Sequence, residues 1–163
     1  HKIDQIKVEE FHEYSSQSEI YKYLEFEPFK SFKETEDYLE KIDNRINSGL
    51  SDYRFLKFHK SDEIIGLMGF TSFNAYRKSI EFGYGISPKY QRRGLFKEAS
   101  NFLINSLFKK NLIHRVYSIT SIYNEGSIKG LPSLALMKEG VLRDYYFKNN
   151  IYFDAVLYSK INN

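Results

Sequence analysis

Residues 81 to 110 change from a two-residue period to a helical period, and this change constrains the fold more than any other feature of the chain. Alternation over the first six positions predicts a strand. One face of that strand carries Phe82, Tyr84 and Ile86, and the other carries Glu81, Gly83 and Gly85. A basic turn at residues 91–94 follows. Beyond the turn, an apolar stripe predicts an amphipathic helix that ends near Lys110. The stripe comprises Leu95, Ala99, Phe102, Leu103, Ser106 and Leu107.

The basic turn has the properties of an anion-binding site. A helix begins with backbone N–H groups that lack an intrahelical partner, and its dipole favours negative charge there. Gly94 lets a ligand approach the backbone closely. Arg92, Arg93 and Lys97 add positive charge at the same place. The sequence therefore predicts that the start of this helix holds an anion.

Two common phosphate-binding motifs do not explain the turn. A Walker loop ends in Gly-Lys-Ser or Gly-Lys-Thr, and the chain contains neither sequence. The dinucleotide fingerprint requires three glycines at fixed spacing after a strand. Gly83 and Gly85 begin this spacing, but Pro88 stands at the third position. Neither nucleotide motif is therefore present.

The segment Gln91-Arg92-Arg93-Gly94-Leu95-Phe96 resembles the Gln/Arg-x-x-Gly-x-Gly/Ala element of the GNAT N-acetyltransferase superfamily. The preceding Glu-Phe-Gly-Tyr-Gly-Ile-Ser-Pro segment resembles the fourth strand of that family. Phe96 stands where the family usually has a small residue. In this family the turn and the helix start hold the pyrophosphate of acetyl-CoA. The resemblance points to the branch of ribosomal-protein N-terminal acetyltransferases (RimJ/RimL).

Length and composition exclude several kinds of site and partner. A length of 163 residues predicts one domain, residues 1–163, that is long enough to bury a core. The absence of cysteine excludes disulfides, cysteine zinc sites and an acyl-cysteine intermediate. A formal charge of only +3, with no long basic run, argues against a nucleic-acid partner. No apolar run is long enough to span a membrane and no secretory segment leads the chain, so we expect a cytoplasmic protein.

The N-terminal part is predicted to form a strand and two helices. We expect the first strand at residues 3–11. A capping box at Ser16–Glu19 predicts a short helix that ends near Leu24. A second capping box at Ser31–Glu34 predicts a longer helix, for which Gly49 is the stop.

A meander of strands should follow. Residues 53–59 and 64–73 predict a hairpin through a turn at residues 60–63. A second turn at residues 74–78 leads into the strand that begins at Glu81. Sequential strands joined by short turns are usually antiparallel neighbours. The strand at residues 116–122, which comes after the long helix, should instead lie parallel to its predecessor through a right-handed crossover.

The C-terminal part carries a second resemblance. Asn124-Glu125-Gly126-Ser127, followed by Glu139-Gly140, matches the spacing of the closing Asn-x-x-Ser motif of the GNAT family. Leu131 stands where many relatives have tyrosine, and Ala135-Leu136 replace the usual Gly-Phe. Pro132 predicts a short or kinked helix between the two ends of the motif. Residues 141–147 and 151–160 predict a final hairpin.

Together, these features predict an α/β (α+β) GNAT fold. The resemblance implies a central mixed, mostly antiparallel sheet of six to seven strands, with helices on both faces. It also implies one parallel pair of strands that splays apart to admit the pantetheine arm of the cofactor.

Acetyl transfer to an amine needs a base, because an alkylammonium must lose its proton before it attacks. Glu81 is the best-placed carboxylate, and the alternative is a glutamate that faces solvent or forms an ion pair. The departing thiolate needs a proton, and Leu131 leaves the usual donor position vacant. Ser127 is a candidate donor, although a plain helix N-cap is an equal alternative for it. Tyr145 or Tyr146 is a weaker candidate. Because the thiolate of CoA leaves readily, water could also supply the proton.

The developing oxyanion needs a hydrogen-bond donor, and the backbone N–H of Ile86 or Ser87 would serve if the strand bulges. The residues expected at acetyl-CoA are Gly85, Ile86, Ser87, Gln91, Arg92, Arg93, Gly94, Leu95, Phe96, Lys97 and Asn124. The acceptor amine, a protein N-terminus or a small molecule, is expected near Phe26, Glu27, Phe29, Tyr145 and Tyr146. No metal is expected, since the four histidines lack ligand spacing.

Two other functions remain open at the level of sequence. One is a non-catalytic sensor that binds acyl-CoA, suggested by the departures at Phe96, Leu131 and Ala135. The other is a domain that uses the basic turn for a different phosphate ligand. The sequence determines neither the acceptor nor the oligomeric state, and a homodimer is compatible with it.

Overall fold

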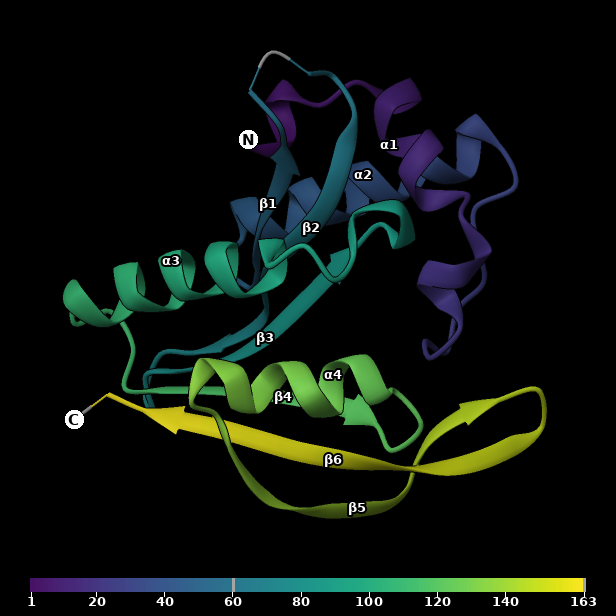
Figure 1. Ribbon diagram of the computed structural model, residues 1–163. Coiled ribbons are helices and arrows are strands. Elements are labelled where there is room, and N and C mark those ends of the chain that lie inside the picture. The colour runs from purple at the N-terminus through teal and green to yellow at the C-terminus, as the bar shows by residue number, and fades with distance from the viewer. Residues whose placement is uncertain (60, 163) are drawn as a thin grey trace.

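The computed structural model describes residues 1–59 and 61–162. Within them, six strands form one sheet in the order β1-β2-β3-β4-β6-β5 (Figure 1). The strands are β1 (Asp52–Lys57), β2 (Ile64–Asn74), β3 (Ser79–Ile86), β4 (Arg115–Ser121), β5 (Met137–Lys148) and β6 (Ile151–Ile161). Strands β1, β2 and β3 are antiparallel neighbours, β3 and β4 are parallel, and β6 is antiparallel to both β4 and β5. The predicted sheet is therefore confirmed, with six strands.

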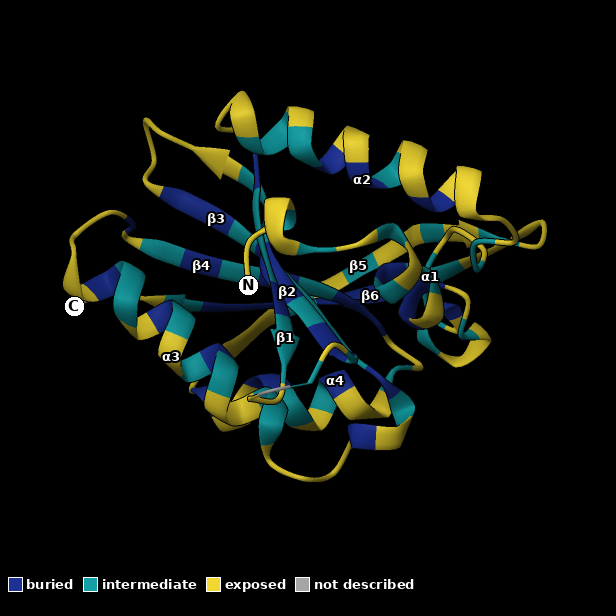
Figure 2. Ribbon diagram, turned by 90° about the horizontal axis from the view of Figure 1, so that it is seen from above, coloured by how far each residue is buried: buried dark blue, intermediate teal, exposed yellow. Residues whose placement is uncertain are grey.

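Helices cover both faces of the sheet (Figure 2). One face carries α1 (Val8–Ser15) and α2 (Phe32–Asn47), and the other carries α3 (Leu95–Lys109) and α4 (Glu125–Gly130). Short 3-10 turns lie at Ile3–Gln5, Ser18–Tyr21, Pro88–Tyr90 and Leu131–Leu134. No helix of the described chain combines the length and the apolar content needed to cross a bilayer.

Helix α2 begins and ends where the sequence predicts. The side chain of Ser31 accepts a hydrogen bond from the amide of Glu34 at 3.2 Å, which caps the helix start. Gly49 follows the helix with a φ of 71°, a left-handed conformation that glycine adopts without steric strain. Local capping chemistry therefore explains this element.

The strand predicted at residues 3–11 is wrong. The segment forms a 3-10 turn and then the first half of α1. Glu10 accepts a hydrogen bond from the backbone N–H of Lys7 at 3.4 Å, which supports a helix start. The buried residues of α1 are Phe11, Tyr14 and Ser15, and the last two lie three and four positions after Phe11, as on one helix face. The buried positions at residues 14 and 15, beyond the predicted strand, therefore show the helical period.

Two other boundaries differ from the prediction. The Ser16–Glu19 segment yields only the 3-10 turn at Ser18–Tyr21, because no side chain caps its start at Gln17. Strand β5 begins at Met137 instead of Val141, since residues 137 and 138 already pair with β6. The hairpin between β1 and β2 is confirmed, although Lys60 in its connection lies outside the described residues.

The sheet separates two hydrophobic clusters. The larger cluster lies under α3 and α4 and includes Phe82, Ile104, Val116 and Leu131. The smaller cluster lies under α1 and α2, with Phe11, Tyr14, Leu39, Phe55 and Ile64 as its buried members. Each face of the sheet is thus anchored by its own pair of helices.

Strands β3 and β4 part soon after they meet. Their pairing covers only Ser79 with Arg115, Ile80 with Val116 and Glu81 with Tyr117. Strand β3 nevertheless continues to Ile86 and β4 to Ser121. The splayed parallel pair is therefore confirmed, and Glu81 is the last residue of β3 that pairs with β4.

Gly69 of β2 lies where β1 passes very close. It pairs with Tyr53, and a Cβ atom on Gly69 would lie 1.9 Å from the backbone oxygen of Asp52. No side chain fits there unless β1 moves away from β2. We therefore expect Gly69→Ala to lower the free energy of unfolding by about 2 kcal/mol, as overpacking of a dense interior typically does. Urea unfolding followed by circular dichroism measures this change.

Gly140→Ala is the matched control for this variant. A Cβ atom on Gly140 would meet no atom within 4 Å, and its backbone φ is not positive. The control should unfold near the wild-type midpoint. Equal destabilisation of the two variants would contradict the close approach of β1 at Gly69.

Candidate functional site

The start of α3 is open and uncapped. Gly94 is the N-cap residue, with φ 80° and ψ −10°, and it offers no side chain to the first turn. Its carbonyl accepts from the amide of Glu98 at 3.1 Å, which is the first bond of the helix. The amides of residues 95–97 therefore precede the helical ladder. Residues 91–94 are all exposed, so these amides begin a helix that faces solvent.

A scaffold of hydrogen bonds holds the basic turn against the end of β3. Gln91 donates from its side chain to the carbonyl of Ile86 at 3.0 Å. Tyr90 donates its amide to the carbonyl of Ser87 at 2.8 Å, and the guanidinium of Arg93 lies 5.3 Å from the Tyr90 ring centroid. Arg92 has a φ of 60°. The side chain of Gln91 thus supports the turn, while Arg92 and Lys97 remain exposed.

Phe96 points away from this open surface. Its ring lies 4.6 Å from that of Tyr84, between centroids, and a Cβ on Gly130 would come within 3.0 Å of it. The side chain therefore fills the space between α3 and α4, where Gly130 makes room for it. This bulky residue does not obstruct the amides at the helix start.

Beyond Glu81, backbone groups of β3 face the opening toward β4. Ser87 donates its amide to the carbonyl of Ile65 at 2.9 Å, so this amide belongs to the contact with β2. Successive strand residues direct their backbone groups to opposite edges. The amide of Ile86 therefore faces the β4 side, where pairing has already ended. Of the two amides considered for the oxyanion, only that of Ile86 faces the opening.

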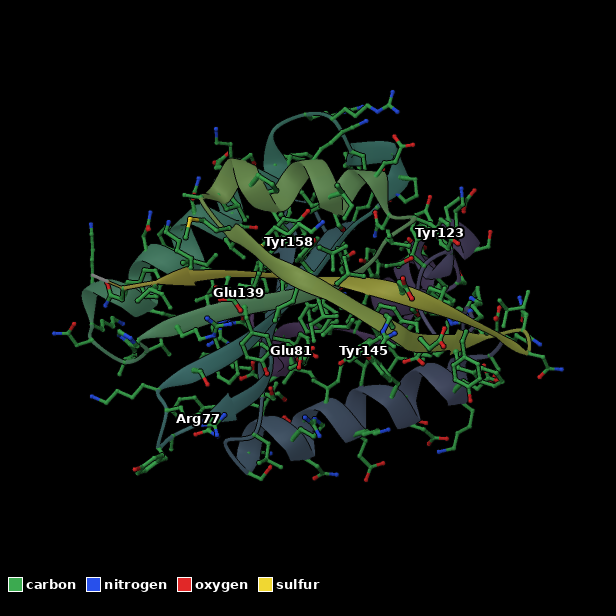
Figure 3. The ribbon with its side chains drawn as sticks, turned by 90° about the horizontal axis from the view of Figure 1, so that it is seen from below. Arg77, Glu81, Tyr123, Glu139, Tyr145 and Tyr158 are labelled. Carbon is green, nitrogen blue, oxygen red and sulfur yellow. The ribbon has the colours of Figure 1, made fainter. Side chains whose placement is uncertain are left out.

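Glu81 lies at the point where the strands part, on the face of the sheet covered by α2. Four tyrosines, hereafter the tyrosine cluster, lie around it: Tyr53, Tyr117, Tyr145 and Tyr146. Figure 3 shows Glu81 and Tyr145 in the same region between the sheet and α2. Burial raises the pKa of Tyr53, and the negative charge of Glu81 raises it further. The cluster therefore places four phenol side chains around one glutamate.

Tyr145 and Tyr146 meet at the irregular part of β5. Their ring centroids are 5.0 Å apart in a perpendicular arrangement. Tyr146 donates from its hydroxyl to the carbonyl of Ile119 at 3.1 Å, which fixes it against β4. Tyr145 is 46% exposed and open to solvent. Burial and then the charge of Glu81 raise the pKa of Tyr145, so its phenol stays neutral near neutral pH.

The other residues predicted at the acceptor site have different surroundings. Phe29 packs in the smaller core cluster, 4.9 Å from Tyr38 between ring centroids. Its place is structural, and its predicted contact with the acceptor is not supported by this geometry. Phe26 is 47% exposed, and the carboxylate of Glu27 lies 3.2 Å from Nζ of Lys148. The segment around Glu27 is therefore brought to the tip of the β5–β6 hairpin.

Ser127 is not the N-cap of α4, so this alternative for its role is wrong. Asn124 is the N-cap, and its side-chain oxygen accepts from the amide of Ser127 at 3.1 Å. Ser127 itself is buried. The hydroxyl of Tyr84 is also buried and has no hydrogen-bond partner of good geometry within the described chain. Burial raises the pKa of Tyr84 to about 12, although Ser127 and Ser118 act to lower it.

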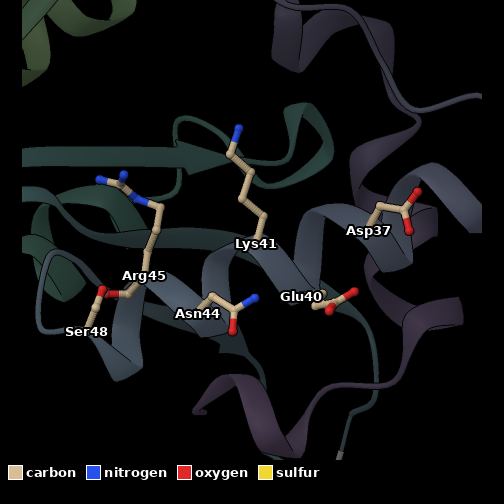
Figure 4. Close-up of a pocket in the computed structure, with 6 residues that line it drawn as sticks. All are labelled: Asp37, Glu40, Lys41, Asn44, Arg45 and Ser48. Atoms are coloured by element: carbon tan, nitrogen blue, oxygen red, sulfur yellow. The ribbon is translucent and has the colours of Figure 1, made fainter.

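A shallow depression of about 460 Å³ lies along α2 (Figure 4). It is lined by Asp37, Glu40, Lys41, Asn44, Arg45 and Ser48. Both signs of charge are represented, and none of the residues predicted for the site is among them. Arg45 donates to the carbonyl of Thr71 at 2.7 Å and so ties α2 to β2. No group of three or more acidic, histidine or cysteine side chains suited to a metal occurs in the described residues.

Sequence reasoning missed three members of the site: Tyr53, Tyr117 and Glu25. Tyr53 and Tyr117 look like ordinary strand residues, and only the assembly of β1, β2, β3 and β4 into one sheet brings them to Glu81. Glu25 accepts a hydrogen bond from the amide of Phe147 at 2.9 Å. No local sequence pattern predicts this contact, because the two residues lie far apart in the chain.

Comparison with known proteins agrees with this geometry. A family model described as an acetyltransferase (GNAT) domain matches residues 2–134. The uncharacterized N-acetyltransferase p20 of Bacillus licheniformis is 29% identical over 147 residues, which cover 90% of this chain and 83% of that protein. The spermidine N(1)-acetyltransferase of Vibrio cholerae is 26% identical over 144 residues, covering 88% and 81%. The crystal structure of the microcin C7 self-immunity acetyltransferase MccE, in complex with acetyl-CoA and AMP, has a TM-score of 0.87 at 22% identity, covering 94% and 86%.

The family model extends from the N-terminal helices to the 3-10 turn after α4, which is most of the chain. The similarity to MccE shows that the fold is shared over nearly the whole length. The resemblance drawn from the turn at residues 91–96 is thereby confirmed. This chain belongs to the GNAT family of acetyltransferase domains.

Proposed function

We propose that this protein transfers the acetyl group of acetyl-CoA to a primary amine by direct attack within a ternary complex. One observation carries the proposal: the opening between β3 and β4 has a site for an anion at one end and a carboxylate at the other. The uncapped, cationic start of α3 follows the end of β3, and Glu81 with the tyrosine cluster lies where the opening begins. Family membership and the acetyl-CoA in the related MccE structure support the same activity.

The start of α3 is the proposed site for the diphosphate of acetyl-CoA. Free amides in the first helical turn bind phosphate oxygens, and the helix dipole favours their charge. Arg92, Arg93 and Lys97 neutralise the remaining charge. The pantetheine arm then enters the opening between β3 and β4, where Asn124 lies at the start of α4. Acetyl-CoA supplies the activated acyl group as a thioester.

The chemistry then needs three functions from the chain. Glu81 takes a proton from the alkylammonium, so that the amine nitrogen can attack the carbonyl carbon. The amide of Ile86 donates to the oxyanion that forms on the carbonyl oxygen. The carbon–sulfur bond breaks as the amide forms, and the proton that the attacking nitrogen gives up is relayed to the sulfur through Ser127 or a water molecule. The acetylated amine and CoA leave.

The acceptor is proposed to enter over the tyrosine cluster. Tyr145 is partly exposed and provides a route from solvent to Glu81. The resemblance to the RimJ/RimL branch suggests a protein N-terminus. The name of the Vibrio cholerae relative suggests a small aliphatic amine. Both acceptors have the primary amine that the mechanism requires.

Glu81→Gln tests the proposed base. Glutamine keeps the size and polarity of the side chain but cannot accept the proton, so kcat should fall by about a hundredfold or more. Without the base, the variant depends on amine that has already lost its proton in solution, so the loss of rate should be greatest at lower pH. Steady-state rates across pH measure both effects.

Calorimetry with CoA is the control for this variant. The affinity for CoA should not change, because Glu81 lies away from the start of α3. A pH–rate profile that keeps its wild-type shape in Glu81→Gln would remove Glu81 from the mechanism.

Gly94→Val tests the proposed diphosphate site. Gly94 has a φ of 80°, which an L-residue adopts only at a strain of about 1–2 kcal/mol. Valine should displace the turn and weaken CoA binding by about tenfold, which corresponds to about 1.4 kcal/mol. Titration calorimetry with CoA measures the change.

Gly49→Val is the matched control. Gly49 also has a positive φ, 71°, and a Cβ on either glycine would meet no atom within 4 Å. Both variants should lose similar stability, but only Gly94→Val should lose CoA affinity. Full retention of CoA binding in Gly94→Val would show that the turn does not approach the co-substrate.

A further inference from the structure

Two carboxylates near the tyrosine cluster have no cationic partner. Neither Glu81 nor Glu25 lies within 4.0 Å of a lysine, arginine or histidine nitrogen of the described chain. Neighbouring Glu27, in contrast, pairs with Lys148 at 3.2 Å. Two unpaired negative charges therefore lie at the site, and a ligand with positive charge would complement both of them.

Glu25 is held in place by backbone contacts from the distant β5–β6 hairpin. One of its carboxylate oxygens accepts the amide hydrogen of Phe147 at 2.9 Å. Lys148, the next residue, donates to the carbonyl of Tyr21 at 2.9 Å. Together with the Glu27–Lys148 pair, these contacts fasten residues 21–27 to the hairpin tip. The hydrogen bond from Phe147 thus fixes the carboxylate of Glu25 through one oxygen and does not involve the other.

Tyr145 and Tyr146 link the two carboxylates. They directly precede Phe147, whose amide holds Glu25, and Tyr146 is bonded to Ile119 on β4. Glu81 of β3 pairs with Tyr117, which lies on β4 two residues before Ile119. Burial is the main cause of the raised pKa of Tyr145 and of Tyr146, and a neighbouring tyrosine, Glu81 and Glu25 each raise it further. The two phenol rings therefore lie within reach of both negative charges.

We propose that Glu25 forms a second anionic subsite of the acceptor site, so that the preferred acceptor is an aliphatic diamine. This inference rests on the proposed function, because it assigns Glu81 to the reacting amine. The distal ammonium binds at Glu25, and the methylene chain lies along the rings of Tyr145 and Tyr146.

The physical basis is a difference in charge between the two amines of the acceptor. The amine at Glu81 must give up its proton to that carboxylate before it attacks, so it reacts in the neutral form. The distal amine remains charged, and it is attracted both to Glu25 and to the faces of the phenol rings. A monoamine of the same chain length has the reacting group and the apolar chain but lacks the distal charge. The diamine should therefore be the better substrate.

The test measures kcat/KM for a series of α,ω-diaminoalkanes and for the n-alkylamines of the same chain lengths. The value for each diamine is divided by two, because either of its two amines can react. In the wild-type protein, the ratio of diamine to monoamine should be about threefold to fivefold, the range of a partly exposed ion pair. Glu25→Gln should bring this ratio close to one. Glutamine keeps the oxygen that accepts from Phe147, so the loop should stay fastened while the charge is lost.

Glu36→Gln is the control, because Glu36 lies on α2 in an exposed pair with Lys33 at 3.5 Å. Its diamine-to-monoamine ratio should equal that of the wild type. Salt gives a second readout, since screening in 1 M salt should reduce the wild-type ratio. This readout decides the question even if Glu25→Gln does not fold.

Three results would overturn the inference: a wild-type ratio near one, a ratio that Glu25→Gln leaves unchanged, or a wild-type ratio that salt does not affect. Each of them leaves acetylation of monoamines intact and so leaves the proposed function standing. Failure of the proposed function gives a different result, namely no acetyl transfer to either class of amine while the protein remains folded.

Discussion

The separation of β3 from β4 beyond Glu81 is the constraint on which the candidate site depends. A strand in the interior of a sheet normally satisfies its backbone groups on both edges, and unpaired buried groups are costly. Here β3 runs on past its last pair with β4, while β2 continues to hold its other edge. The unpaired edge therefore has backbone groups that an extended ligand could bind. The same separation places the amide of Ile86, the residue Glu81 and the start of α3 around one opening.

The two faces of the sheet contribute differently to this opening. Under α3 and α4 the core is densely packed, and Phe96 fills the gap that Gly130 leaves. This packing holds the first turn of α3 in place while its amides face solvent. On the other face, the core of α1 and α2 gives way to tyrosines and one carboxylate near Glu81. Under the proposed function, the first face positions the acetyl-CoA site, and the second presents Glu81 to the amine.

Several elements could be predicted because their signals are local. Helix α2 has its cap, its apolar stripe and its glycine stop within one continuous segment. The turn at residues 91–94 likewise carries its glycine and its cations side by side. The strand predicted at residues 3–11 was wrong because a few apolar residues in a short segment do not distinguish a strand from a helix face. The burial of Phe11, Tyr14 and Ser15 against other elements decided in favour of the helix.

The candidate site shows the same division. From the sequence alone we could identify the strand–turn–helix unit, its charge, its glycine and the carboxylate that precedes it, because all of them lie within thirty consecutive residues. Only the tertiary structure revealed that Tyr53, Tyr117 and Glu25 join Glu81, and that Phe29 belongs to the core. The physical reason is that capping and periodicity act over a few residues. Strand pairing and the hydrogen bond from Phe147 to Glu25, in contrast, join residues far apart in the chain, and no local pattern specifies them.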